Sequence, residues 1–148
     1  MIGRPRLAVV AAGVMLLATG CTVTAPAPDP GSVQTCADLI AAAPAVVAGQ
    51  PQRATDQPES AVAWGDPAVL LACGVADPPG FGPTSECYEV DGIGWYAEPV
   101  DGAYRFTTLD RTPRIQVTVP SAYEPQAAVL TDLSEAISTT IPQQRPCV

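Results

Sequence analysis

The chain of 148 residues contains no histidine and no lysine, and these absences exclude several function classes. Without histidine there is no Ser-His-Asp or Cys-His catalytic set, no histidine-ligated zinc and no imidazole that titrates near neutral pH. The seven cationic residues are all arginine and face fifteen Asp and Glu, so the formal net charge is -8. Nucleic-acid binding depends on positive charge at the phosphates, so we expect no nucleic-acid partner.

The first twenty residues have the pattern of an export signal, with Arg4 and Arg6 ahead of an apolar run that begins at Leu7. Residues 7–20 would reach about 21 Å as a helix, which is short of the ~30 Å hydrocarbon core and disfavours a spanning anchor. The ending LLATGC resembles a bacterial lipobox, except that Ala18 stands where leucine is usual. We therefore predict a signal peptide over 1–20 and lipid attachment at Cys21; an ordinary cleavable signal is the alternative.

Residues 21–34 are rich in proline and show no apolar periodicity. Pro26, Pro28 and Pro30 stand at every second position, a composition typical of extended linkers. We expect an extended, solvated tether between the lipid and a single folded domain over 35–148.

Four cysteines remain after Cys21, and an even set in an exported chain predicts two disulfides. Three pairings are open. We expect Cys73–Cys87, which would close a loop rich in Gly and Pro, and Cys36–Cys147, which would join the two ends of the domain. No two cysteines stand at the CxxC spacing of redox or zinc motifs, so we expect no metal and no cofactor.

The apolar spacing predicts a helix at each end of the domain and short strands between them. Ile115, Val117 and Val119 give the clearest strand alternation, and Asp91-Gly92 is a hairpin signal. A helical stripe follows Pro125: Val129, Leu130, Leu133, Ala136, Ile137 and Ile141. The expected fold is an α+β two-layer sandwich with an antiparallel sheet of five to six strands.

Four residues are candidates for binding. Trp64 and Trp95 could stack on sugar rings of a wall polymer, although both alternate with apolar neighbours and core packing is the simpler interpretation. Arg111 and Arg114 flank Thr112-Pro113 and could hold a carboxylate or phosphate, or else pair with surface acids.

No residue set predicts catalysis. Ser85 has no neighbouring histidine or lysine to activate it, and its surroundings do not form a nucleophile elbow. Glu86, Glu89 and Asp91 are the acids that a carboxylate-dependent enzyme would use, but acids on a hairpin are commonly solvated. We therefore expect a non-enzymatic protein.

Four segments together resemble the actinobacterial envelope proteins grouped as "domain of unknown function 3515". They are CADLI at 36–40, VAWGDPAVLLACGV at 62–75, PTSECYEVDGIGW at 83–95 and RTPRIQVTVP at 111–120. The resemblance covers about 35–142 and implies an exported, membrane-associated or lipid-anchored protein of an actinobacterium. It carries no established activity.

The sequence thus predicts a lipid-anchored envelope protein at the outer face of the cytoplasmic membrane, where it binds an envelope protein or a wall component. The alternative is a cell-wall enzyme that uses carboxylates.

Overall fold

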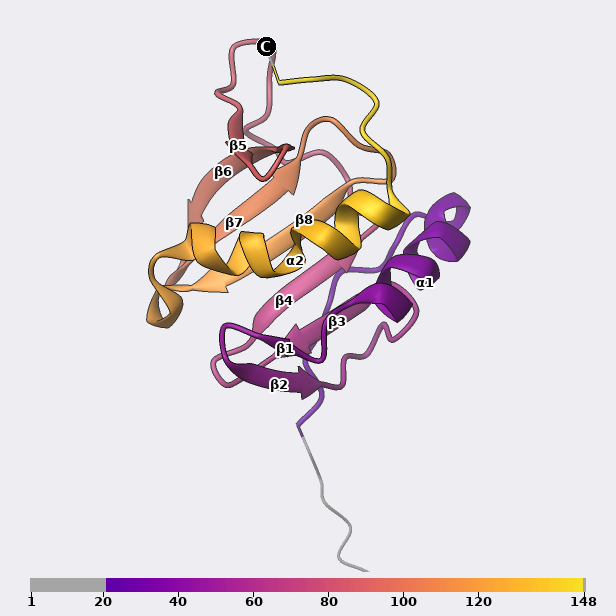
Figure 1. The fold of residues 1–148 in the computed structure, drawn as a ribbon. Coiled ribbons are helices and arrows are strands. Elements are labelled where there is room, and N and C mark those ends of the chain that lie inside the picture. Colours follow the sequence, from indigo (N-terminus) through magenta and orange to yellow (C-terminus); the bar gives the residue numbers. More distant parts are fainter. Residues whose placement is uncertain (1–20, 148) are drawn as a thin grey trace, which may run out of the picture.

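Two helices lie on one face of an eight-stranded antiparallel sheet in the computed structural model, which describes residues 21–147 (Figure 1). The predicted signal peptide lies outside the described residues. The helices are α1 (Val33–Ala42) and α2 (Gln126–Thr140), with short 3-10 turns at Pro30–Ser32 and Ser121–Tyr123. The strands are β1 (Val46–Val47), β2 (Gln50–Arg53), β3 (Ala61–Trp64), β4 (Val69–Cys73), β5 (Tyr88–Val90), β6 (Ile93–Val100), β7 (Ala103–Thr108) and β8 (Ile115–Pro120).

The sheet consists of two meanders of four strands each, in the order β1-β2-β3-β4-β8-β7-β6-β5. The first meander runs from β1 to β4 and the second from β5 to β8. They join where β4 pairs with β8, with Leu71 opposite Val117 and Cys73 opposite Ile115. The connection 74–87 therefore crosses from the middle of the sheet to its far edge.

The main core lies between the sheet and the helices. α1 buries Cys36 and Leu39, and α2 buries the predicted stripe as far as Ile137. Ile141, the last residue of that stripe, is buried directly after the helix ends. On β8 the residues Ile115, Val117 and Val119 are buried while the residues between them are half-buried, as the alternation predicts. Neither helix of the described part is long and apolar enough to cross a bilayer.

The segment 22–32, here called the N-terminal strap, lies along the domain and is not the solvated tether that its prolines suggested. Val23 forms a parallel bridge with Thr55, and the Asp56 carboxylate accepts a hydrogen bond from the Ala25 amide at 2.8 Å. Ala25 itself is buried in a small second cluster with Ala61 and Ala72. Proline is compatible with this packing because the strap pairs with the domain at only a few backbone positions and needs few N–H donors.

The strap continues to Gly74, whose carbonyl accepts a hydrogen bond from the Asp29 amide at 2.8 Å. Gly74 has φ +76°, and a Cβ at this position would lie 3.1 Å from the Pro28 Cβ. Glycine thus permits both the left-handed turn after β4 and the close approach of the strap.

The α+β class is confirmed, but the predicted number of five to six strands is too low. The missed strands are β1 and β2, which are short and lie at one end of the sheet. β2 reads Gln-Pro-Gln-Arg, so it has neither the apolar alternation nor the composition that marks a strand.

Two disulfides are present, but the expected connectivity is wrong: Cys36 pairs with Cys73, and Cys87 pairs with Cys147. Cys73 ends β4 and Cys87 precedes β5, which is four strands away in the sheet. At about 4.8 Å per strand that separation is about 19 Å, whereas the Cα atoms of a disulfide lie within about 7 Å. Each observed bridge stays within one meander and its helix.

Gly94 on β6 lies against the Cys87–Cys147 disulfide, and we predict that Gly94→Ala destabilises the protein. An added Cβ would lie 2.6 Å from Cys147 Sγ and 3.0 Å from Cys87 Sγ. Overpacking of this kind costs about 1–3 kcal/mol of unfolding free energy, measurable by denaturant titration.

Gly82→Ala is the matched control, because a Cβ there meets nothing within 4 Å. Equal unfolding free energies for the two variants would show that the close packing at Gly94 is wrong.

Candidate functional site

The two tryptophans are both fully buried, so the simpler interpretation, core packing, is confirmed and neither ring is free to stack on a sugar. Trp64 has no exposed surface, and its indole N–H donates to the Pro44 carbonyl at 2.9 Å. Trp95 is equally buried, but its indole N–H has no hydrogen-bond partner among the described residues.

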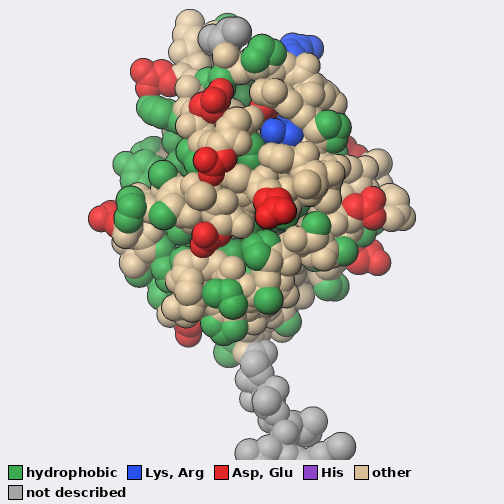
Figure 2. Space-filling view, in the orientation of Figure 1, with side chains coloured by type: hydrophobic (Ala, Val, Ile, Leu, Met, Phe, Trp, Pro, Cys, Tyr) green, Lys and Arg blue, Asp and Glu red, His purple; other side chains and the backbone are tan. Residues whose placement is uncertain are grey.

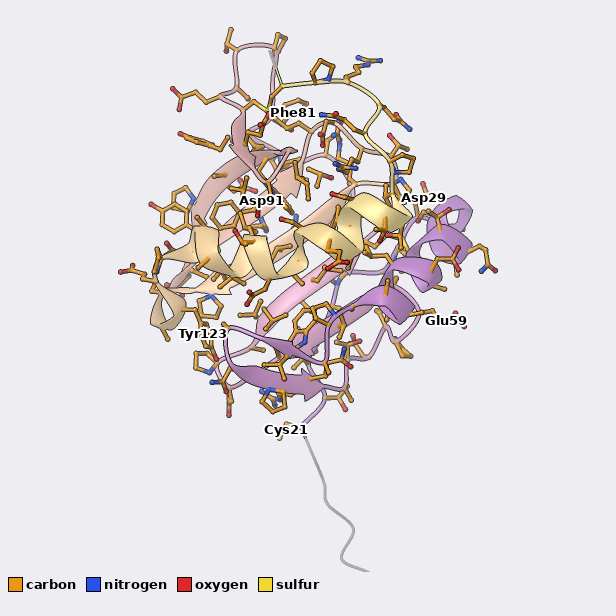
Figure 3. The ribbon with its side chains drawn as sticks, in the orientation of Figure 1. Cys21, Asp29, Glu59, Phe81, Asp91 and Tyr123 are labelled. Carbon is orange, nitrogen blue, oxygen red and sulfur yellow. A yellow bond between two sulfur atoms is a disulfide. The ribbon has the colours of Figure 1, made fainter. Side chains whose placement is uncertain are left out.

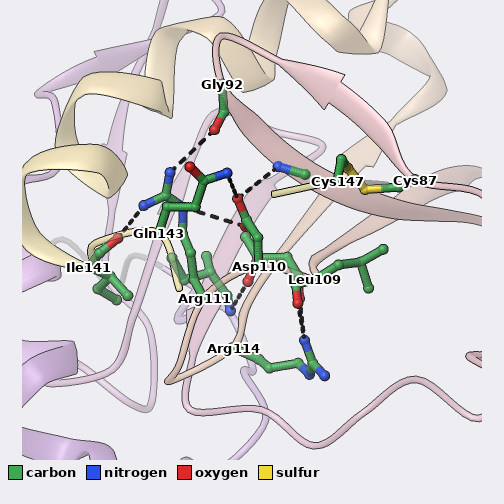
Figure 4. Close-up of polar contacts among 12 residues, drawn as sticks. Cys87, Gly92, Leu109, Asp110, Arg111, Arg114, Ile141, Gln143 and Cys147 are labelled. Atoms are coloured by element: carbon green, nitrogen blue, oxygen red, sulfur yellow. Dashed lines mark hydrogen bonds and ion pairs between the residues drawn. A yellow bond between two sulfur atoms is a disulfide. The ribbon is translucent and has the colours of Figure 1, made fainter. Parts of the chain in front are cut away.

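Arg111 is also buried and does not offer a free guanidinium to an anion (Figure 4). It lies beside Asp110, with Nε 3.6 Å from Oδ1, and donates hydrogen bonds to the carbonyls of Ile141 and Gly92. The Asp110 carboxylate accepts from the Gly94 amide at 3.3 Å and from the Gln143 side chain at 3.0 Å. This pair ties the loop after β7 to the end of α2 and to the β5–β6 turn.

The Arg114 guanidinium is also bonded within the protein. It pairs with Asp77, donates to the carbonyls of Thr108 and Leu109 at 2.8 and 3.2 Å, and lies over the Phe81 ring at 5.4 Å from its centroid. Its contacts brace the connection 74–87 against the sheet. Pairing with surface acids was the other interpretation of this stretch. It fits Arg114, whose partner Asp77 is exposed, but not Arg111, whose partner Asp110 is buried.

Asp110 was missed by the sequence reasoning, which treated the acids as surface groups. Its position directly before Arg111 is the only sequence signal, and a neighbouring pair of opposite charges is common on surfaces. Burial of the pair depends on the Ile141 and Gln143 contacts, which join residues thirty and thirty-three positions apart.

An open groove of about 590 Å³ lies between the N-terminal half of α2 and the β5–β7 part of the sheet. Its floor and one wall are aromatic: Tyr88, Trp95, Tyr104 and Phe106. Gln126, Ala127 and Leu130 of α2 form the other wall. We call this the aromatic groove.

The aromatic side chains of the groove support one another. Tyr104 stacks on Phe106 with ring centroids 6.2 Å apart, and Phe106 meets Trp95 edge to face at 6.5 Å. Tyr88 and Tyr104 are 50% and 43% exposed, and both are among the few large apolar side chains that reach the surface. Exposed aromatic residues over a rigid buried base are typical of binding surfaces.

Tyr88 carries a polar contact at the mouth of the groove. Its hydroxyl donates to the Glu86 carboxylate at 2.6 Å. This hydrogen bond, together with the negative charge of Glu86, raises the pKa of Tyr88 above its ordinary value. The phenol therefore stays protonated to higher pH than a free tyrosine, and it donates to one oxygen of Glu86.

The other two candidate acids are solvent-exposed. Glu89 is the central residue of β5, and Asp91 occupies the left-handed first position of the β5–β6 turn with φ +49°. Within the described part of the chain, no three Cys, Asp or Glu side chains gather into a metal site.

The fold and the groove define a disulfide-linked α+β protein with a candidate binding surface. The chain belongs to the family described as protein of unknown function (DUF3515), whose profile matches residues 8–146. No curated protein and no solved structure matches the chain. The family resemblance noted in the sequence is thereby confirmed.

We predict that Glu86→Gln lowers the pKa of Tyr88, because the neutral amide removes the charge that favours the protonated phenol. The change is measured by following the ring carbon resonance of Tyr88 by NMR as the pH rises. Glu59→Gln, a change at an exposed acid outside the groove, should leave the titration unaltered. An unchanged Tyr88 titration in Glu86→Gln would contradict the contact.

Proposed function

We propose that this protein is a lipid-anchored binding module at the outer face of an actinobacterial cytoplasmic membrane, and that the aromatic groove is its binding surface. The observation that carries the proposal is the pair of half-exposed tyrosines beside the buried Trp95 and the half-buried Phe106. A monomer gains nothing from leaving such rings in water, whereas a partner that covers them gains their burial.

The acids support a binding role more than a catalytic one. Glu86 is held by Tyr88, while Glu89 and Asp91 stand exposed on a strand and its turn. This is the usual environment of solvated carboxylates, so no observation favours the carboxylate-dependent enzyme.

The position of Cys21 supports the anchoring part of the proposal. The Cys21 carbonyl accepts a hydrogen bond from Arg53 on β2 at 3.1 Å, so the lipid attachment residue stands against the domain. Cys21 lies at the opposite end of the molecule from Phe81, and Asp91 of the β5–β6 turn lies well away from it (Figure 3). A lipid at Cys21 would therefore leave the β5–β6 end facing away from the bilayer.

We predict that Cys21→Ser abolishes membrane attachment, since serine has no thiol to receive the diacylglyceryl group. The variant should appear in the medium or as unprocessed precursor, measured by fractionation and by the mass of the chain. Recovery of the variant at mature size in the membrane fraction would overturn the lipid anchor.

We predict that a photo-cross-linking amino acid at Tyr104 captures one defined partner in intact cells. The same amino acid at Val46, which is 54% exposed but lies at the other end of the sheet, is the matched control. The affinity behind the Tyr104 product should fall by more than tenfold when Tyr88→Ala removes the second exposed ring of the groove, because aromatic hot-spot residues contribute about 2 kcal/mol or more.

Identical products from both positions, or only abundant nonspecific proteins, would overturn the groove as the binding surface. Membrane attachment is measured by fractionation and the binding surface by cross-linking, so the lipid anchor and the aromatic groove are tested independently.

A further inference from the structure

β5 forms the outer edge of the sheet beside the aromatic groove. The geometry of its hairpin shows which of its backbone N–H and C=O groups face β6 and which face outward. Val90 and Ile93 are partners that flank the two-residue turn Asp91-Gly92, in which both residues have positive φ. In such a hairpin the flanking pair exchanges both hydrogen bonds, and the pair one step further does not. The next pair is Glu89 with Gly94.

The contacts of Gly94 agree with this assignment. Its carbonyl accepts from the Leu109 amide at 2.9 Å, and its amide donates to the Asp110 carboxylate at 3.3 Å. Both backbone groups of Gly94 therefore point away from β5. The N–H and C=O of Glu89 consequently point to the open side of the strand, where no described residue bonds them.

A strand added at this edge would reach the groove with every second side chain. Tyr88, Glu89 and Val90 all border the groove. Because neighbouring side chains of a strand alternate, those of Tyr88 and Val90, which pair with Trp95 and Ile93, share one face of the sheet, and that of Glu89, which pairs with Gly94, lies on the other. A residue paired with Glu89 would share its face, and the residues before and after it would enter the groove.

The acidic side chains near this edge favour a basic residue in the partner strand at the position opposite Glu89. Glu89 is exposed and forms no ion pair among the described residues, and Glu86 and Asp91 stand near it along the chain. Acidic side chains are also spread across the helical face; the few arginine atoms on this face lie in its upper part, at the end that holds β5 and β6 (Figure 2). A basic side chain opposite Glu89 would be stabilised across the strands.

We propose that the partner in the aromatic groove is an extended protein segment with the pattern apolar–basic–apolar, which pairs with β5 through the backbone of Glu89. The two apolar side chains pack beside Tyr88 and Val90 at the β5 side of the groove, and the basic one faces the Glu89 carboxylate. Main-chain hydrogen bonds supply the alignment and the groove supplies the side-chain preference. This inference rests on the groove being the binding surface.

The test uses purified protein from Cys21 to Val148, made with Cys21→Ser, and the blocked peptide Ala-Leu-Arg-Leu-Ala. Two control peptides are Ala-Leu-Glu-Leu-Ala, which reverses the charge, and Ala-Arg-Leu-Arg-Ala, which moves the apolar residues to the other face. We expect binding of the first peptide only, with slowed hydrogen exchange of the Glu89 amide and no change at Glu59. Equal affinity for all three peptides, or no binding of the first, overturns the proposal.

Glu89→Pro and Glu89→Gln separate the backbone from the charge. Proline removes the outward N–H but no hydrogen bond to β6, so the edge strand should survive it. We expect Glu89→Pro to bind about fivefold more weakly than Glu89→Gln, the effect of one backbone hydrogen bond. Circular dichroism confirms folding.

Equal affinity of these two variants would overturn strand pairing. If Tyr104→Ala still weakened the peptide, the groove itself would stand, so the two proposals fail separately. A dimer in sedimentation that Glu89→Pro dissociates would instead make a second copy of this chain the occupant and overturn the assigned partner.

Discussion

The pairing of β4 with β8 is the contact on which the rest of the architecture depends. It joins two meanders whose other contacts are made mainly by α2, which packs on α1 and β1, and by the connection 74–87. Leu71 opposite Val117 places two fully buried side chains at the centre of the combined sheet, where both helices can cover them. Because the N-terminal strap belongs to the first meander and the aromatic groove to the second, this seam also fixes how they lie relative to each other.

Local features of the fold could be predicted from the sequence because they depend on neighbouring residues. The Asp91-Gly92 hairpin follows from two adjacent residues, and the burial on β8 follows from apolar residues at every second position. The stripe on α2 follows from apolar residues spaced three or four positions apart. The disulfides could not be predicted in this way, since their pairing follows from the order of strands in the sheet. β1 and β2 were missed because a polar strand at the end of the sheet needs no apolar pattern, and the strap was missed because its contacts are mostly backbone hydrogen bonds.

The candidate site shows the same limit. Tyr88, Tyr104 and Phe106 were predictable as strand residues, but their exposure depends on where α2 begins and how much of the second meander it covers. Trp95 has the same alternation and is fully buried, so alternation alone does not distinguish a ring in the core from a ring at the surface. Likewise, nothing local distinguishes the buried Asp110–Arg111 pair from an exposed one.

The order of the cysteines has a consequence for how the chain acquires its fold. The closed loops 36–73 and 87–147 follow one another and do not interleave. A chain that emerges from its N-terminus presents Cys36 and Cys73 together while Cys87 is still to come, so the first native bridge can form with no competing thiol from the second. Each bridge stabilises by about 4 kcal/mol in the chain-entropy model. The first meander can thus be covalently closed early and then serve, through the free side of β4, as the template on which β8 completes the sheet.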